Sequence, residues 1–180
     1  MEIALLGLCG SLRAPSFNAM LLRAAAASYN APGFVQANLR LPLYDGDAEQ
    51  ATGLPADVVT LASQILAAKA IVIAAPEYNK SLSGVLKNAL DWVSRTKSAP
   101  WRDKPVAIIS AAGGREGGAR AQFALRLALI PFRPRLLPGP EVCVANCEAA
   151  FDAEGRLLDA RYQKSLDDLM GALHAESLRS

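Results

Sequence analysis

Short apolar runs alternate with helical repeats along most of the chain, and this alternation restricts the fold more than any other feature. Residues 3–9 form a nearly continuous apolar run, which is typical of a strand buried on both faces of a parallel sheet. Residues 70–75 and 105–110 repeat that pattern. Apolar residues at helical spacing occupy the segments 16–28, 57–68, 82–93 and 158–173. Because parallel neighbours need crossover helices, the sequence predicts an α/β fold with a doubly wound parallel sheet.

Weaker signals complete the predicted sheet. Residues 34–39 indicate a second strand, and residues 135–144 can supply a fifth. We therefore expect a flavodoxin-like sheet of five parallel strands in the order 2-1-3-4-5. At 180 residues the chain has the usual length of one domain, so we expect a single domain over residues 1–180.

Two further segments have less regular patterns. Residues 41–45 are typical of a surface loop. The Gly-rich segment 113–118 leads into an expected helix that carries Phe123, Leu127 and Ile130, and Pro131 ends it.

Charge and hydropathy exclude several classes of protein. The net charge is +2, and no run of five or six like charges occurs, which argues against a nucleic-acid partner. The most apolar stretch, residues 65–75, is interrupted by Lys69 and closed by Pro76, so we expect no membrane insertion. The chain starts without the basic and long apolar segments of a signal peptide. Three cysteines without a Cys-x-x-Cys pair favour neither a disulfide framework nor a zinc site, and they favour a cytoplasmic location.

Three loops follow strands at the edge of the sheet where ligands bind in such folds, at residues 10–18, 76–82 and 110–118. The first contains donors suited to a phosphate: the hydroxyls of Ser11 and Ser16, the guanidinium of Arg13, the amide of Asn18, and the amides of a helix N-terminus. No Gly-Lys-Ser/Thr triplet of a nucleoside triphosphatase is present. The alternative is that Ser16 only caps the helix.

The second loop concentrates polar groups between an apolar strand and an apolar helix. Its residues could meet the polar edge of a flat heterocycle while apolar groups cover its face. These residues are Pro76, Glu77, Tyr78, Asn79 and Ser81. The alternative is that Asn79 and Ser81 only cap the helix that begins near Ser83.

Both loops together resemble the NAD(P)H-dependent FMN reductases, which include quinone and chromate reductases. The motifs that carry the resemblance are Gly10-Ser11-Leu12-Arg13-x-x-Ser16-x-Asn18 and Pro76-Glu77-Tyr78-Asn79-x-Ser81-x-x-Gly84-x-Leu86-Lys87-Asn88-x-x-Asp91-Trp92. It extends through Leu41-Pro42-Leu43-Tyr44-Asp45 and Gly117-Gly118-Ala119-Arg120-x-Gln122, and so covers residues 3 to about 146.

The resemblance implies a flavodoxin-like subunit that holds one FMN. Ser11, Arg13, Ser16 and Asn18 would hold its phosphate, whereas Pro76 to Asn79 with Ser81 would border the isoalloxazine ring. Gly114 and Gly117 would flank the other side of the ring. The resemblance also implies a homodimer or homotetramer, paired in part through the helix at 82–93. Relatives have small or apolar residues where this chain has Arg115 and Glu116, so the nicotinamide and acceptor preferences stay open.

The implied reaction passes hydride from NAD(P)H through FMN to a small-molecule acceptor: a quinone, an azo compound, a metal oxyanion or free flavin. No catalytic side chain is then required, because the flavin supplies the chemistry. This agrees with the position of the only histidine, His174, in the closing helix far from the three loops. Arg115 is a candidate for contact with the additional phosphate of NADPH.

Three alternatives stay open at this point. A flavodoxin-type electron carrier would share fold and cofactor, although its surface is usually strongly acidic. A nicotinamide-binding Rossmann domain could use residues 113–118, although their spacing is not Gly-x-Gly-x-x-Gly. A non-enzymatic flavodoxin-like interaction protein is the third.

Overall fold

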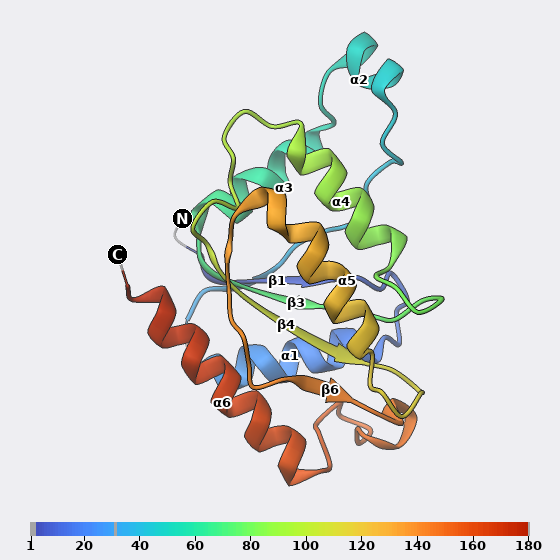
Figure 1. Ribbon diagram of the computed structural model, residues 1–180, viewed down its shortest axis with the longest axis vertical. Helices are drawn as coiled ribbons and strands as arrows, with labels where there is room; N and C mark the ends of the chain where they lie inside the picture. The colour runs from blue at the N-terminus through green and yellow to red at the C-terminus, as the bar shows by residue number, and fades with distance from the viewer. Residues whose placement is uncertain (1–2, 31, 180) are drawn as a thin grey trace.

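One parallel sheet forms the centre of the protein, as the computed structural model shows for residues 3–30 and 32–179 (Figure 1). Its hydrogen-bonded strands run in the order β2-β1-β3-β4-β5, and β6 also pairs with β4. The strands are β1 (Ile3–Cys9), β2 (Phe34–Gln36), β3 (Ala68–Ala74), β4 (Pro105–Ala111), β5 (Arg135–Leu136) and β6 (Val142–Val144). The expected flavodoxin-like order 2-1-3-4-5 is confirmed.

Helices cover both faces of the sheet (Figure 1). On one face lie α1 (Phe17–Tyr29) and α6 (Ala160–Ser177), and on the other lie α3 (Ala56–Ala67), α4 (Gly84–Ser94) and α5 (Ala119–Leu129). The remaining elements are α2 (Gly46–Thr52) and the 3-10 turns η1 (Ile130–Phe132) and η2 (Cys147–Ala149). Within the described ranges, none of the helices has the length and apolar character needed to cross a bilayer.

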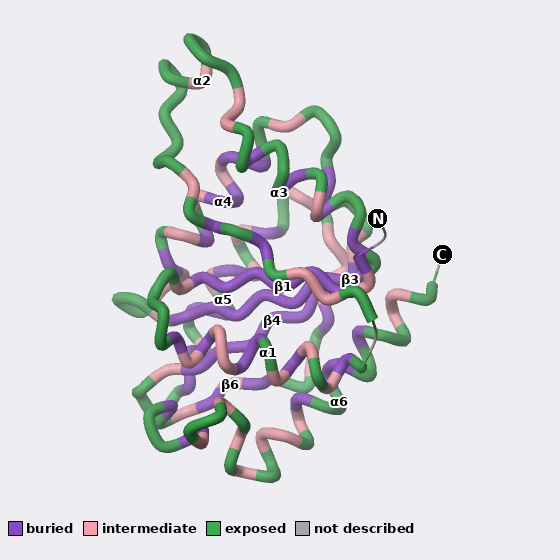
Figure 2. Tube along the Cα trace, turned by 180° about the vertical axis from the view of Figure 1, so that it is seen from behind, coloured by how far each residue is buried: buried purple, intermediate pink, exposed green. Residues whose placement is uncertain are grey.

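Strand β3 explains why the central strands are apolar throughout. Its side chains alternate between faces, so Ile71 and Ile73 pack under α3, α4 and α5 while Val72 and Ala74 pack under α1 and α6. All four are at most 1% exposed, and the purple centre of Figure 2 shows the same burial along the sheet. A strand with helices on both sides has no polar face to present.

The expected fifth strand, residues 135–144, is divided into two short strands. β5 pairs with the beginning of β4, whereas β6 pairs with its end. Pro138 and Pro140 lie in the intervening segment, and neither has an N–H to donate to a sheet ladder. The fifth position of the sheet is therefore shared by two strands, so the sheet has six strands within the described residues.

Helix α5 packs through a different face from the one that carries Phe123 and Leu127, and Ile130, expected in the same helix, lies in η1. Those three side chains are 58%, 69% and 63% exposed. The buried face instead contains Ala121, Gln122, Leu125 and Leu129. Because the buried residue Gln122 is polar, this face did not stand out as an apolar pattern in the sequence.

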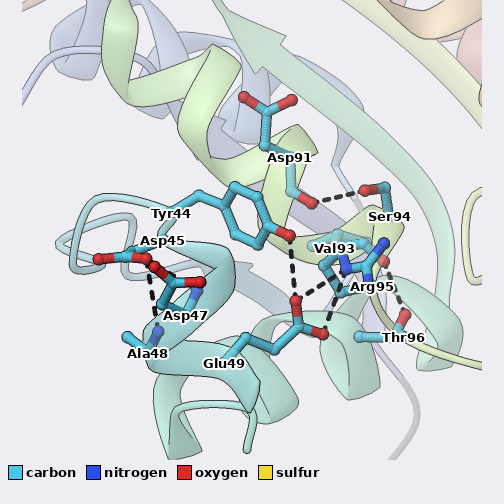
Figure 3. Close-up of polar contacts among 10 residues, drawn as sticks. All are labelled: Tyr44, Asp45, Asp47, Ala48, Glu49, Asp91, Val93, Ser94, Arg95 and Thr96. Carbon is cyan, nitrogen blue, oxygen red and sulfur yellow. Dashed lines mark hydrogen bonds and ion pairs between the residues drawn. The ribbon is translucent and has the colours of Figure 1, made fainter. Parts of the chain in front are cut away.

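The segment before α2 is a surface excursion, as expected, and it is attached to α4 (Figures 1 and 3). Glu49 of α2 accepts hydrogen bonds from the Tyr44 hydroxyl at 3.1 Å and from Arg95 Nε at 2.9 Å. Trp92 Nε1 donates to the Pro42 carbonyl at 2.7 Å, and its ring meets Tyr44 edge-on at 5.0 Å. The excursion is thus held by side chains of one helix rather than by the sheet.

Candidate functional site

A cavity of about 190 Å³ lies where the loops after β1, β3 and β4 meet, and we call it the loop cavity. All three expected loops, 10–18, 76–82 and 110–118, contribute lining residues. It lies at the carboxyl ends of the parallel strands, which is the ligand-binding edge of doubly wound sheets.

The first loop brings Ser11, Arg13, Ser16 and Asn18 to this cavity. Ser16 is the N-cap of α1, and its Oγ accepts a hydrogen bond from the Ala19 amide at 3.3 Å. The capping role is therefore present, and Ser16 lines the cavity as well. The first turn of α1 contains no acidic residue, so the positive end of its dipole is not neutralised from within.

Asn18 joins the first loop to the third. Its Nδ2 donates to the Ala111 carbonyl at 2.8 Å, and its Oδ1 accepts from the Ala111 amide at 3.1 Å. The residue is 5% exposed. One of its two amide hydrogens is thereby used, which leaves one for a ligand.

The second loop is a tight two-residue turn. Tyr78 and Ser81 exchange two backbone hydrogen bonds of 3.1 Å, and Asn79 and Lys80 between them have φ of 50° and 63°. Two successive positive φ values define a type I′ turn, in which asparagine is favoured. Asn79 and Ser81 therefore shape the turn and do not line the cavity, whereas Pro76, Glu77 and Tyr78 do.

Two side chains tie the second loop to its neighbours. Glu77 accepts a hydrogen bond from the Arg120 amide at 3.1 Å, which joins it to α5. The Tyr78 hydroxyl lies 3.5 Å from Ser11 Oγ across the mouth of the cavity. The alternative in which Asn79 and Ser81 cap α4 is wrong, because Ser83 is the N-cap of that helix.

Ser83 also connects the first and second loops, although no functional signal marked it in the sequence. Its Oγ donates to the Gly10 carbonyl at 2.8 Å and accepts from the Leu86 amide at 3.3 Å. Ser83 is fully buried. The hydrogen bonds of Ser83 therefore fix the distance between the first and second loops.

The third loop lines the cavity through Ala111, Ala112 and Gly113, not through Gly114 or Gly117. Gly117 has φ of +58°, and a Cβ there would lie 2.4 Å from the Cys143 carbonyl carbon and oxygen. Glycine is required at that position for packing against the strand. At Gly114 a Cβ would meet nothing within 4 Å.

The sequence did not indicate Cys147 and Glu148, which line the same cavity from η2. The turn follows β6 at the same sheet edge, and the Cys147 amide donates to the Ala112 carbonyl at 3.2 Å. The sequence signal that could have indicated these two residues was a fourth loop, which follows the last expected strand. His174 lies elsewhere, in α6, with its ring 5.2 Å from that of Tyr29.

The charges around the loop cavity are unequal. The first loop contributes the positive charge of Arg13 and of the N-terminus of α1, whereas the second loop and η2 contribute the carboxylates of Glu77 and Glu148. Glu77 is partly compensated by the guanidinium of Arg120 at 3.8 Å. Burial, together with Glu148, raises the pKa of Cys147, so its thiol is neutral at neutral pH. The donors at the first loop fit a phosphate, and the backbone groups of the other loops fit a polar ring edge.

Comparison with known proteins places the chain in a family. The family model for NADPH-dependent FMN reductase matches residues 3–149. The chain belongs to the NADPH-dependent FMN reductase family. It is 42% identical to an NAD(P)H-dependent FMN reductase of Pseudomonas aeruginosa over 180 residues, covering 96% of this chain and 94% of that protein. It is 39% identical to a quinone reductase of Escherichia coli over 97% of this chain and 93% of that protein.

A solved structure supports the same assignment. The flavoenzyme NAD(P)H:(acceptor) oxidoreductase FerB of Paracoccus denitrificans superimposes with a TM-score of 0.86 at 28% identity, covering 97% of each chain. Membership in the FMN reductase family confirms the expected enzyme class and the expected use of FMN with NAD(P)H. The electron-carrier, Rossmann and interaction-protein alternatives are not needed to account for these matches.

Proposed function

We propose that this FMN reductase family member passes hydride equivalents from NAD(P)H through FMN held in the loop cavity to a quinone or another small-molecule acceptor. The observation that carries the proposal is the meeting of three loops around one cavity, in which the first loop supplies the anion donors and the second and third loops supply other lining residues. FMN, when bound, accepts hydride from a nicotinamide and passes electrons to the acceptor.

The protein's part in this chemistry is positioning. Ser11, Arg13, Ser16 and the first turn of α1 would hold the phosphate, with Asn18 supplying its remaining amide hydrogen. Pro76, Glu77 and Tyr78 would border the ring, and backbone donors of that loop would stabilise negative charge on it. Asn79 and Ser81 would act through the shape of the turn, and Gly114 and Gly117 through the path of the third loop.

We further propose a quinone acceptor and a homo-oligomeric assembly. A quinone agrees with the names of several relatives, among them the quinone reductase of E. coli. A homodimer or homotetramer agrees with the exposed apolar side chains of α5. Pairing through α4 stays a prediction. The free thiols of Cys9, Cys143 and Cys147 support a reducing, cytoplasmic compartment.

The test begins with the purified protein. We expect visible flavin absorbance from bound FMN, and NAD(P)H oxidation that accelerates when a quinone is added. Bound flavin without turnover would instead indicate an electron carrier, and absence of FMN affinity would contradict the proposal.

A matched pair of variants tests the phosphate position. Aspartate and asparagine both cap helices as serine does, so Ser16→Asp and Ser16→Asn should preserve α1 and differ by one negative charge. We expect FMN affinity, measured by flavin fluorescence titration, to be at least about tenfold weaker for Ser16→Asp than for Ser16→Asn. Equal affinities would place the phosphate elsewhere.

A further inference from the structure

A second cavity, of about 410 Å³, lies on the other side of the first loop. It is bounded by the end of β1, the first turns of α1 and the segment that follows β2. Three arginines line it, Arg13, Arg23 and Arg40, and we call it the arginine cavity. It shares Ser11 and Arg13 with the loop cavity, so the two adjoin.

The three arginines have no carboxylate partner within the lining of this cavity, as far as the described residues extend. Among the described residues that line it there is no Asp or Glu. No ion pair within residues 3–30 and 32–179 involves Arg13, Arg23 or Arg40. The buried Cys9 also lines the cavity, and burial raises the pKa of its thiol, so it adds no negative charge at neutral pH.

Arg40 is held in place without losing its capacity to bind an anion. Its backbone amide donates to Asn38 Oδ1 at 3.0 Å, and its Nη2 donates to the Leu12 carbonyl at 2.8 Å. A guanidinium has five N–H donors, so most of them remain. Their planar arrangement suits the oxygens of a phosphate.

We propose that the arginine cavity binds a phosphate monoester distinct from the phosphate of FMN, and that during turnover this group is the 2′-phosphate of NADPH. The second part rests on the proposed function, which supplies a cosubstrate whose two forms, NADPH and NADH, differ by that phosphate alone. Because the two cavities share Ser11 and Arg13, this site adjoins the position proposed for the FMN phosphate.

Arg115 is the competing candidate, and its surroundings argue against it. Its side chain is 92% exposed, and its Nε lies 3.3 Å from a carboxylate oxygen of Glu116. The pair carries no net charge. Arg23 and Arg40, by contrast, face a cavity that no carboxylate of the described residues lines.

The direct test is calorimetric binding of 2′,5′-ADP and 5′-AMP to the purified protein, because these probes differ by the 2′-phosphate alone. The variants are Arg23→Gln and Arg40→Gln. Arg102→Gln is the matched control, since Arg102 is exposed and lines neither cavity. Arg115→Gln tests the competing position. Thermal melting and FMN titration of each variant confirm that fold and flavin site persist.

We expect the wild-type protein to bind 2′,5′-ADP at least about tenfold more tightly than 5′-AMP, with inorganic phosphate competing. Arg23→Gln and Arg40→Gln should each reduce this preference severalfold, whereas Arg102→Gln and Arg115→Gln should retain it. In steady-state kinetics the KM for NADPH should rise in parallel while that for NADH stays constant.

Equal binding of the two probes, or a preference that survives both cavity variants, would overturn the inference. So would a preference lost only in Arg115→Gln. Arginine-dependent binding of 2′,5′-ADP by a protein that oxidises no NADPH would support the phosphate site and contradict the proposed function, so the two failures are distinguishable.

Discussion

The loop cavity and the arginine cavity adjoin at the first loop, but they are built by different means. Buried hydrogen bonds fix the walls of the loop cavity, among them those of Asn18 and of Ser83. The arginine cavity is bordered by long, exposed cationic side chains. Of its three arginines, only Arg40 makes a side-chain hydrogen bond within the described part of the chain, to the Leu12 carbonyl. One cavity therefore offers fixed geometry, and the other offers charge on side chains that can adapt to a ligand.

The largest effect on the loop cavity is expected when the third loop is displaced. Gly117→Ala places a Cβ 2.4 Å from the Cys143 carbonyl at a φ of +58°. We expect the free energy of unfolding, measured in urea, to fall by roughly 3 kcal/mol, with loss of FMN affinity. Gly114→Ala is the control, since its Cβ meets nothing within 4 Å. It should change stability by less than about 1 kcal/mol. Similar losses in both would refute the packing argument.

The loop cavity should also open when Asn18 is replaced by its isostere. Asn18→Asp keeps the acceptor for the Ala111 amide and loses the donor to the Ala111 carbonyl. We expect a loss of about 2 kcal/mol in the free energy of unfolding at neutral pH. The loss should shrink as the pH falls, because a protonated carboxyl donates again. A loss independent of pH would exclude this cause.

The long helices and strands of this fold were predictable because each shows one regular pattern of apolar residues along its length. The burial of β3 on both faces makes every residue small or apolar except Lys69, and that run is visible in the sequence. Where packing depends on a polar residue, the period fails. Gln122 is 3% exposed and donates to Ser110 Oγ and the Val142 carbonyl, so the buried face of α5 did not look apolar.

The parts of the candidate site that are continuous in the sequence were predictable, whereas the parts assembled from distant residues were not. Ser11 to Asn18 and Pro76 to Tyr78 are continuous segments, and topology brings them together. Arg23 belongs to α1 and Arg40 to the segment after β2, with no shared motif, and only the folded chain brings both to one cavity. No local pattern marks such a cavity.

Arg13 belongs to both cavities, so its removal should weaken both kinds of binding at once. For Arg13→Gln we expect the affinities for FMN and for 2′,5′-ADP each to fall about tenfold, since one charge-assisted contact is lost in each site. Fluorescence titration and calorimetry measure the two affinities. A change in only one would assign Arg13 to that cavity alone.

The smallest expected effect compares a thiol in each cavity. Burial is the main cause that raises the pKa of both Cys9 and Cys147 above the ordinary value of 9.0. The weaker causes differ between the two thiols: hydrogen bonds with Ser11 and Ser16, and then the charge of Arg23, lower the pKa of Cys9, whereas the charge of Glu148 raises that of Cys147. Because both native pKa values are raised, the buried thiols stabilise the fold below the unfolded pKa, and this contribution is lost as the pH rises through the native values.

Alkylation reports these charges, since the thiolate is the reactive form. At a fixed alkaline pH, Arg23→Gln should slow the labelling of Cys9, and Glu148→Gln should accelerate that of Cys147. Each change should be less than about threefold, because salt screens exposed charges. Peptide mass spectrometry after brief iodoacetamide treatment measures both sites in one sample, with Cys143 as the internal reference. Changes of the same direction at Cys9 and Cys147 would show that the two cavities do not differ in charge as their side chains indicate.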